Sequence, residues 1–503
     1  MNQKLRMLLL LIFGISLIAT FVLEEYNRNR SIVPEKNPLM TSQPYIVNDP
    51  LPIKMNLPAK ETIIQEPLYQ MDIDFNAEKH YLAGKTQIVV WNTGSLPTNE
   101  IKFQLYLNAF NKGKHPPVLK PFLSKTYPSG LKYGEIKVNR VLVDEKVLSY
   151  KSNGIVMSIQ LGSAWKPGTK RVVTLEWRAD IPEIYHRIGM DGGNFWFGNT
   201  LPILAAYDNG WKTNQYEIVG DPFNSDIANY TVNIKTPREY EVVATGNETA
   251  QLNGGIRLTR IEASKVRDFT FSVFKKTKKT SVKNSSNIQV NLYYNKVKDH
   301  TAEKAVKQAA AFLTYMEKQL IDYPYAELDI FENEMFITGM EYPGMVYIDS
   351  DRLKDPKGMQ TLLHEIAHQW FYNLVGNDQI SEPWLDEGFA TFFTNRYMQS
   401  KGLLPKVSNE LLAKEIKNHS LKIDSVKEYK AWSPYWQGVY QRSSYLLFDL
   451  QRIMGEGAFN EMLKEYVGNN AYKKVTTKDF QEVVQKRISK DLSSFWDDWF
   501  NLR

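Results

Sequence analysis

The sequence of 503 residues contains no cysteine. This absence excludes disulfide bonds, thiolate zinc sites and catalysis by cysteine. The chain also lacks a large excess of either positive or negative charge. The net charge is only +6 and is dispersed along the chain, which argues against nucleic acid as a partner. The composition, with 43% hydrophobic and 13% aromatic residues, is typical of a globular protein. The length predicts two or three domains.

The N-terminus predicts a location. Lys4 and Arg6 precede an uncharged apolar run at residues 7–23, which predicts a signal anchor with a cytoplasmic stub within residues 1–30. A secreted protein that has lost a cleaved signal peptide is the alternative. Residues 31–60 contain six prolines and show no hydrophobic period, so we expect an extended tether. The remainder of the chain should then lie outside the cytoplasm.

Short alternating segments bounded by turn residues fill residues 61–280 and predict an antiparallel β-sandwich or saddle-shaped sheet domain. The expected strands lie at 69–75, 87–91, 101–107, 141–143, 155–161, 172–177, 230–235, 240–245 and 269–274. The basic run 275–283 is interpreted as a solvated interdomain loop, with binding of an anionic surface polymer as the alternative.

Residues 281–503 have a different pattern, which predicts a mixed α/β region followed by a mostly helical one. The expected elements are a strand at 289–294, a helix from about 301 to 321, strands at 328–331 and 345–348, and helices beyond residue 355. The fold class is therefore multidomain α+β, with a transmembrane helix at its N-terminus.

Histidine is scarce, yet two of the seven histidines stand in His364-Glu365-Ile366-Ala367-His368, the H-E-x-x-H pattern. Apolar flanks, without Gly or Pro over 361–375, predict a buried helix. Residues four apart share one face of a helix, so the two imidazoles can bind one Zn²⁺. Glu365 between them is placed as the general base. A core helix with two hydrogen-bonded histidines is the alternative.

Glu387 is the expected third ligand. Ser381 and Pro383 predict the cap and the first turn of a second helix, and eighteen residues separate Glu387 from His368. That interval is long enough to return a helix alongside the first. Three protein ligands with one open position are typical of a catalytic zinc site, so we expect one zinc ion per chain. A carboxylate at the surface of a helix is the alternative for Glu387.

This arrangement resembles the gluzincin aminopeptidases, the family of aminopeptidase N and the bifunctional leukotriene hydrolase. His368-Gln-Trp-Phe371, Trp384-Leu-Asp-Glu-Gly-Phe-Ala390 and Thr338-Gly-Met-Glu-Tyr342 carry the likeness, which covers roughly residues 65–500. It implies a thermolysin-like catalytic domain at 281–503. The long members have a further helical domain beyond this region, so we expect a more open cleft here.

The resemblance also implies how a substrate is held. Glu341 should bind the free α-amine of a peptide, with Gly339 and Met340 beside it in the substrate-binding segment. This sequence departs from the family pattern, because Thr338 stands where a glycine is usual and Tyr342 where an asparagine is usual.

The family's oxyanion donor is a tyrosine that opens a helix, and Tyr440 matches it best, with Tyr435 and Tyr445 as competitors. The usual Lys-Gly pair that follows is replaced by Arg442-Ser443.

The sequence thus predicts a membrane-tethered zinc metallopeptidase that releases N-terminal residues from peptides with a free N-terminus, as a monomer or weak oligomer. A noncatalytic surface or sensor module on a peptidase scaffold is the alternative, and Glu365 argues against it. A zinc endopeptidase or an epoxide hydrolase could use the same metal site. Glu341 is the discriminating residue, because an exopeptidase needs an anion where the amine lies.

Overall fold

The computed structural model describes residues 66–355, 358–418 and 420–500. The predicted anchor at 7–23 and tether at 31–60 lie outside these residues. Within the described ranges no helix is both long and apolar enough to cross a membrane.

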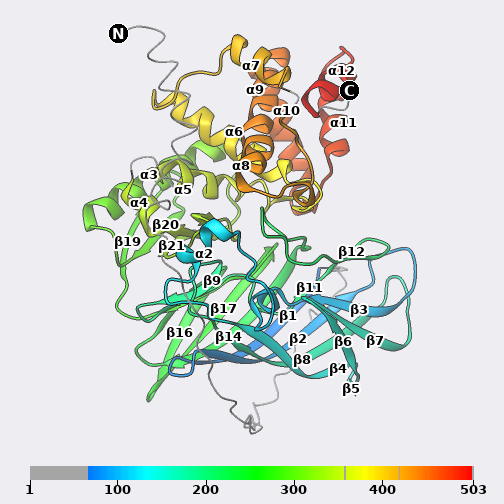
Figure 1. Cartoon of the computed structure of the whole chain (residues 1–503), viewed down its shortest axis with the longest axis vertical. Helices are drawn as coiled ribbons and strands as arrows, with labels where there is room; N and C mark the ends of the chain where they lie inside the picture. Colours follow the sequence, from blue (N-terminus) through cyan, green and yellow to red (C-terminus); the bar gives the residue numbers. More distant parts are fainter. Residues whose placement is uncertain (1–65, 356–357, 419, 501–503) are drawn as a thin grey trace. The chain divides into compact units, whose positions relative to one another are not determined.

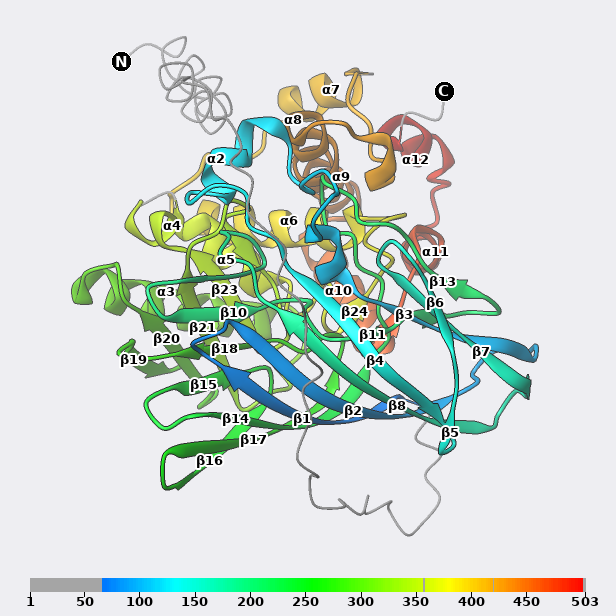
Figure 2. The same cartoon turned by 60° about the horizontal axis from the view of Figure 1, so that its bottom comes forward.

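An eight-stranded sheet forms the base of the β-rich region, in the order β16-β17-β14-β1-β2-β8-β4-β5 (Figures 1 and 2). All neighbours are antiparallel except β1 and β14, which run parallel. These strands form where buried apolar residues alternate with more exposed ones. In β1, for example, every second side chain is buried: Tyr69, Met71, Ile73 and Phe75. The bounds are β1 (Leu68–Asn76), β2 (Tyr81–Trp91), β4 (Glu135–Val143), β5 (Lys146–Val147), β8 (Lys170–Asp180), β14 (Ala228–Pro237), β16 (Asn247–Asn253) and β17 (Ile256–Val266).

Smaller sheets complete this region. One has the order β15-β18-β10-β9 and another β11-β3-β7-β6, and a short pair is formed by β12 and β13. Their bounds are β3 (Thr98–Gln104), β6 (Tyr150–Asn153), β7 (Val156–Trp165), β9 (Ile188–Asp191), β10 (Asn194–Phe197), β11 (Ile203–Leu204), β12 (Ala206–Tyr207), β13 (Trp211–Lys212), β15 (Glu241–Ala244) and β18 (Phe271–Phe274). The short helices η2 (Lys120–Phe122) and α2 (Leu123–Thr126) lie between β3 and β4.

Two local predictions were wrong. The strand expected at 101–107 ends with β3 at Gln104 and continues as a 3₁₀ helix, η1 (Tyr106–Phe110). There the Asn108 side chain bonds both backbone groups of Ile136, which draws the chain out of the sheet. The basic run expected as a loop contains strand β19 (Lys278–Lys283), which pairs with β20. Lysines are tolerated there because β19 is an edge strand.

The second region begins with a five-stranded sheet, in the order β19-β20-β21-β23-β22. Its three central strands are parallel, and α3 connects β20 to β21. The bounds are β20 (Gln289–Tyr294), α3 (Asp299–Gln319), β21 (Glu327–Asn333), β22 (Gly339–Met340), β23 (Met345–Asp349) and α4 (Ser350–Lys354). The strands and helix expected between 289 and 348 are confirmed.

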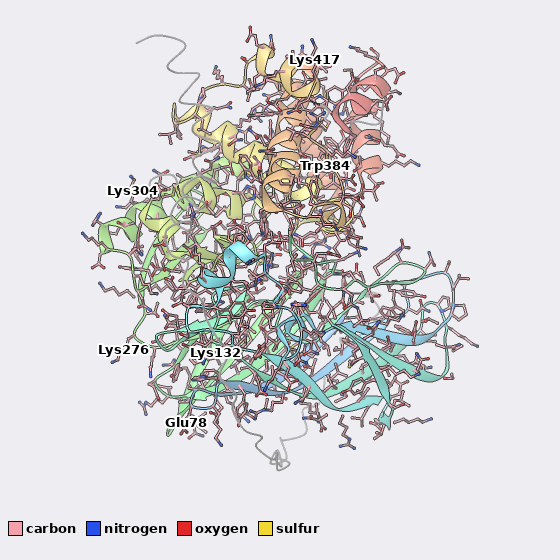
Figure 3. The ribbon with its side chains drawn as sticks, viewed as in Figure 1. Glu78, Lys132, Lys276, Lys304, Trp384 and Lys417 are labelled. Carbon is pink, nitrogen blue, oxygen red and sulfur yellow. The ribbon has the colours of Figure 1, made fainter. Side chains whose placement is uncertain are left out.

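Helices dominate the rest and gather at one end of this region (Figure 1). They are α5 (Gly358–Ala367), α6 (Trp384–Ser400), α7 (Asn409–Ile416), η3 (Val426–Glu428), α8 (Trp432–Tyr435), the π-helix η4 (Trp436–Arg442), α9 (Ser443–Met454), α10 (Glu456–Asn470), α11 (Thr477–Arg487) and α12 (Ser493–Phe500); the strands β24 (Val375–Gly376) and β25 (Lys473–Lys474) pair beside them. Trp384, at the start of α6, is buried among them, whereas Lys276, Lys304 and Lys417 stand at the periphery (Figure 3). The β-rich region followed by a helical one agrees with the predicted fold class, and the boundary at residue 280 stays a prediction.

Candidate metal centre and active site

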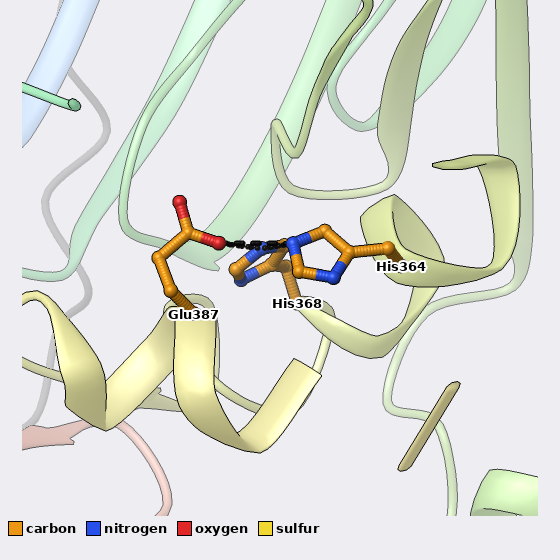
Figure 4. Close-up of side chains that lie close together, drawn as sticks. All are labelled: His364, His368 and Glu387. Carbon is orange, nitrogen blue, oxygen red and sulfur yellow. Dashed lines mark hydrogen bonds and ion pairs between the residues drawn. The ribbon is translucent and has the colours of Figure 1, made fainter. Parts of the chain in front are cut away.

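Two helices bring three ligand atoms together (Figure 4). Nε2 of His364 on α5 lies 2.9 Å from Oε2 of Glu387 on α6 and 3.0 Å from Nε2 of His368. The remaining edge, from His368 Nε2 to Glu387 Oε2, is 3.3 Å. Bonds of about 2.0–2.1 Å to a tetrahedral zinc ion place ligand atoms roughly 3.3 Å apart. The donor set and its spacing therefore fit one zinc ion.

A hydrogen bond on the far side of one imidazole supports this assignment. His368 Nδ1 lies 2.9 Å from the carbonyl oxygen of Phe371, which can only accept. The proton is thereby held on Nδ1, which leaves the Nε2 lone pair directed at the metal position. Among the described residues, the groups able to hold a metal include His364, His368 and Glu387 as a set.

The two helices differ from the expected bounds. Helix α5 ends at Ala367, although a helix was expected over 361–375, and His368 is held one residue beyond it by a hydrogen bond to the His364 carbonyl. The chain then turns at Tyr372, whose φ is +116°. Helix α6 begins at Trp384, and Ser381 does not cap it, because its hydroxyl bonds the Asp378 carboxylate instead.

The carboxylate of Glu365 lies against the edge strand β22. A Cβ atom added to Gly339 would stand 2.6 Å from Cδ and 2.7 Å from Cγ of Glu365. Gly339 therefore gives room to the expected general base. The preceding residue, Thr338, has a φ of +74°, a conformation that glycine adopts more easily than a β-branched residue.

Glu341 lies beside the metal centre and is 3% exposed. Ligand atoms of Glu341, His368 and Asp386 are within 4.8 Å of one another. Burial, followed by the charge of Asp221, raises the pKa of Glu341 to about 8. The structure thus brings together the metal ligands and the residue expected to bind an amine.

Of the three candidate tyrosines, Tyr440 contacts a ligand. Its hydroxyl donates to Oε1 of Glu387, and its ring stacks on that of His364 with centroids 5.4 Å apart. Tyr440 lies in the π-helix η4, a type of helix that is frequent at functional sites. The Tyr445 hydroxyl accepts from Gln441, and the buried Tyr435 hydroxyl faces Gly220. The geometry therefore favours Tyr440.

Sequence reasoning missed a buried ion pair near the site. The Arg187 guanidinium pairs with Asp221 and also donates to Tyr216 Oη and to Met340 Sδ, at 3.1 and 3.3 Å. Arg187 and Asp221 come from the β-rich region and stand in no recognisable motif. Met340, the neighbour of Glu341, is therefore held from the β-rich side.

Tyr342 contacts the β-rich region. It is fully buried, and its hydroxyl donates to Oδ1 of Asn199 at 2.6 Å. Asn199 in turn donates to Asp268. Tyr342, which stands where the family usually has an asparagine, thus contacts the β-rich region.

Several buried carboxyl groups lie close together at the centre, and their pKa values are shifted as a result. Burial, followed by the charge of Glu341, raises the pKa of Glu365 well above its usual range. Burial and the neighbouring Glu387 raise the pKa of Asp386 to about 7. Although burial acts in the opposite sense, the adjacent imidazoles of His364 and His368 lower the pKa of Glu387 to about 2. Such a site is complementary to a divalent cation and to an ammonium group.

The fold and the three-ligand centre define the gluzincin type of metal site. Residues 304–499 match the model of the peptidase family M1 domain. Human endoplasmic reticulum aminopeptidase 2 is 25% identical over 362 residues, which cover 66% of this chain and 37% of that protein. Aminopeptidase 2 of Candida albicans is 26% identical over 237 residues, which cover 42% and 25%. The chain thus spans between a quarter and two fifths of the length of these relatives.

A solved structure shows the same fold. The crystal structure of an M1 zinc metallopeptidase from Deinococcus radiodurans superimposes with a TM-score of 0.63, at 16% sequence identity. The match covers 87% of this chain and 93% of that chain. The β-rich and helical regions together are therefore a known arrangement.

Proposed function

We propose that this protein is a zinc aminopeptidase that hydrolyses the first peptide bond of peptides with a free N-terminus. The observation that carries the proposal is the buried carboxylate of Glu341 next to the three-ligand centre. The two relatives named above are aminopeptidases by name, and they support the same reaction for this chain.

His364, His368 and Glu387 would hold one zinc ion per chain. When bound, zinc supplies Lewis acidity, which lowers the pKa of a water molecule towards about 7 and polarises the scissile carbonyl. Glu365 acts as the general base: its carboxylate accepts a proton from the attacking water and returns it to the leaving amine. Burial raises the pKa of Glu365 and so makes its carboxylate a stronger base than a free glutamate side chain.

Tyr440 donates a hydrogen bond to the oxyanion that develops on the scissile carbonyl. Its hydroxyl contacts Glu387 and its ring lies on His364, so it borders the position at which the carbonyl is attacked. Burial and the neighbouring Glu387 raise the pKa of Tyr440 well above its usual range, so the hydroxyl keeps the proton that it has to donate.

Glu341 sets the point of cleavage. Its carboxylate would pair with the substrate's ammonium group, and Gly339 and Met340 would lie along the first residue of the peptide. An endopeptidase needs no anion at this position. The geometry accordingly favours removal of single N-terminal residues over internal cleavage.

The location is a separate part of the proposal. The apolar run at residues 7–23 would insert as a signal anchor and leave the catalytic region outside the cytoplasm, as a monomer or weak oligomer. Protease added to intact cells should degrade the catalytic region if this topology holds. Full protection of that region, or release of the whole protein into the medium, would contradict the anchored form.

A panel of free and N-acetylated peptides tests the activity, with the full-length protein solubilised in detergent. We expect cleavage of the free peptides alone, and its loss with a chelator or in Glu365→Gln. Glu341→Ala should remove the preference for a free amine and leave bound zinc unchanged. Equal cleavage of both sets by the unmodified protein would favour an endopeptidase. Zinc binding without hydrolysis of any peptide would favour an epoxide hydrolase or a noncatalytic module.

A further inference from the structure

Gln379 makes a two-way contact in the connection between α5 and α6. Its side-chain nitrogen Nε2 lies 2.9 Å from Oε1 of Glu341 and 2.7 Å from Oδ2 of Asp386. The side chains of all three residues are buried, with Gln379 and Asp386 each 1% exposed. One amide group thus joins the carboxylate expected to bind the amine to a second carboxylate on α6.

The second carboxylate is itself fixed. Asp386 directly precedes the ligand Glu387, and its other oxygen, Oδ1, accepts from Nδ2 of Asn377 at 3.0 Å. Two neighbouring side-chain amides therefore hold Asp386 on the ligand helix. Through Gln379, the position of Glu341 is tied to the helix that presents Glu387.

The neutral charge of the Gln379 amide matters as much as its position beside Glu341. Glu341 lies among other carboxyl groups, so like-charge repulsion would push it away from the centre. A lysine or arginine could hold it, but such a cation would neutralise the carboxylate and compete with the ammonium group of a substrate. A neutral amide donates hydrogen bonds and leaves the negative charge of Glu341 available.

We propose that Gln379 is a positioning residue that holds Glu341 at a fixed distance from the metal centre and thereby sets the selectivity for substrates with a free amine. The inference rests on the proposed function and deepens it. Gln379 acts through Glu341, so its contribution should appear in substrate binding and should depend on the presence of the Glu341 carboxylate.

The test uses full-length Gln379→Met, which keeps the length of the side chain and removes both hydrogen-bond donors. Loss of a hydrogen bond to a charged group predicts an increase in KM for aminoacyl anilides of about tenfold or more. kcat should stay within about threefold, because Glu365 and Tyr440 act on the scissile bond. Bound zinc should equal that of the unmodified protein. Gln360→Met is the matched control, because it removes a glutamine–asparagine bond from α5 that does not involve Glu341.

A double-mutant cycle separates positioning from a general structural effect. In the Glu341→Ala background, Gln379→Met should raise KM no further. Equal increases in both backgrounds, or an unchanged KM in Gln379→Met, would overturn the inference. If Gln379→Met does not fold, Gln379→Asn has to raise KM in its place, because its amide is one methylene too short to reach both carboxylates. Failure of the proposed function is seen separately, as an unchanged preference for free amines in Glu341→Ala alone.

Discussion

Substitution of Gly339 by alanine perturbs the general base without touching the metal ligands. The added Cβ would stand 2.6 and 2.7 Å from Cδ and Cγ of Glu365, whereas ordinary contacts between carbon atoms are about 3.5–4.0 Å. Either the Glu365 side chain or strand β22 must therefore move by roughly 1 Å. The carboxylate is the mobile partner, because the strand is held in the sheet by its pairing with β23.

A displacement of this size predicts a large effect on rate. Misplacement of a catalytic group by about 1 Å can cost on the order of 10²-fold. We expect Gly339→Ala to lower kcat for an aminoacyl anilide by about 100-fold, with zinc content unchanged and KM within a few-fold. Gly457→Ala is the control, because a Cβ there meets no other atom within 4 Å. A kcat within threefold of the unmodified protein would show that Glu365 does not need the space that Gly339 leaves.

Further predictions concern stability and pH. The buried guanidinium of Arg442 donates to the carbonyls of Trp499 and Asp498 at 2.9 Å, so Arg442→Met should lower the free energy of unfolding by roughly 3–5 kcal/mol in urea, and a value below 1 kcal/mol would contradict this. Burial and Glu327 raise the pKa of Asp329 from 3.8 to about 7 in the folded state. The folded state then binds more protons between these values, so stability falls as the pH rises through this window. Asp329→Asn should accordingly raise Tm more at pH 8 than at pH 4, and the opposite order would exclude this cause. Removal of zinc by a chelator should lower Tm, and added zinc should restore it, since a ligand of the folded state stabilises that state; an unchanged Tm would contradict a zinc site in the folded protein.

The clustering of His364, His368 and Glu387 could be predicted because its geometry is local. His364 and His368 need only the period of a helix, and Glu387 needs a connection long enough to return a second helix. Glu365 follows from the same period. The break after Ala367 could not be predicted, because the chain turns at Tyr372, whose carbonyl accepts a hydrogen bond from the distant, buried Arg267.

The fold was also only partly predictable: the strands could be predicted, but their pairing could not. Alternation of buried and exposed residues marks a strand such as β1, but it does not say which strand will pair with it. The parallel contact of β1 with β14 joins segments about 160 residues apart, and no local pattern encodes it. Strand β19 was missed because charge in the run 275–283 hid the alternation of Thr280 and Val282, which edge strands combine with lysine.

The segment 338–342 shows why the remaining site residues escaped prediction. Its contacts come from several parts of the chain: the Asp349 backbone N–H donates to the Thr338 carbonyl, Arg187 donates to Met340, and Asn199 accepts from Tyr342. The β-rich region therefore holds one end of the segment that carries Glu341, while Gln379 ties Glu341 itself to the ligand helix. A substitution of Asn199 should thus act on substrate affinity before it acts on zinc binding, because Asn199 bonds Tyr342, the neighbour of Glu341, and the zinc ligands depend on other contacts.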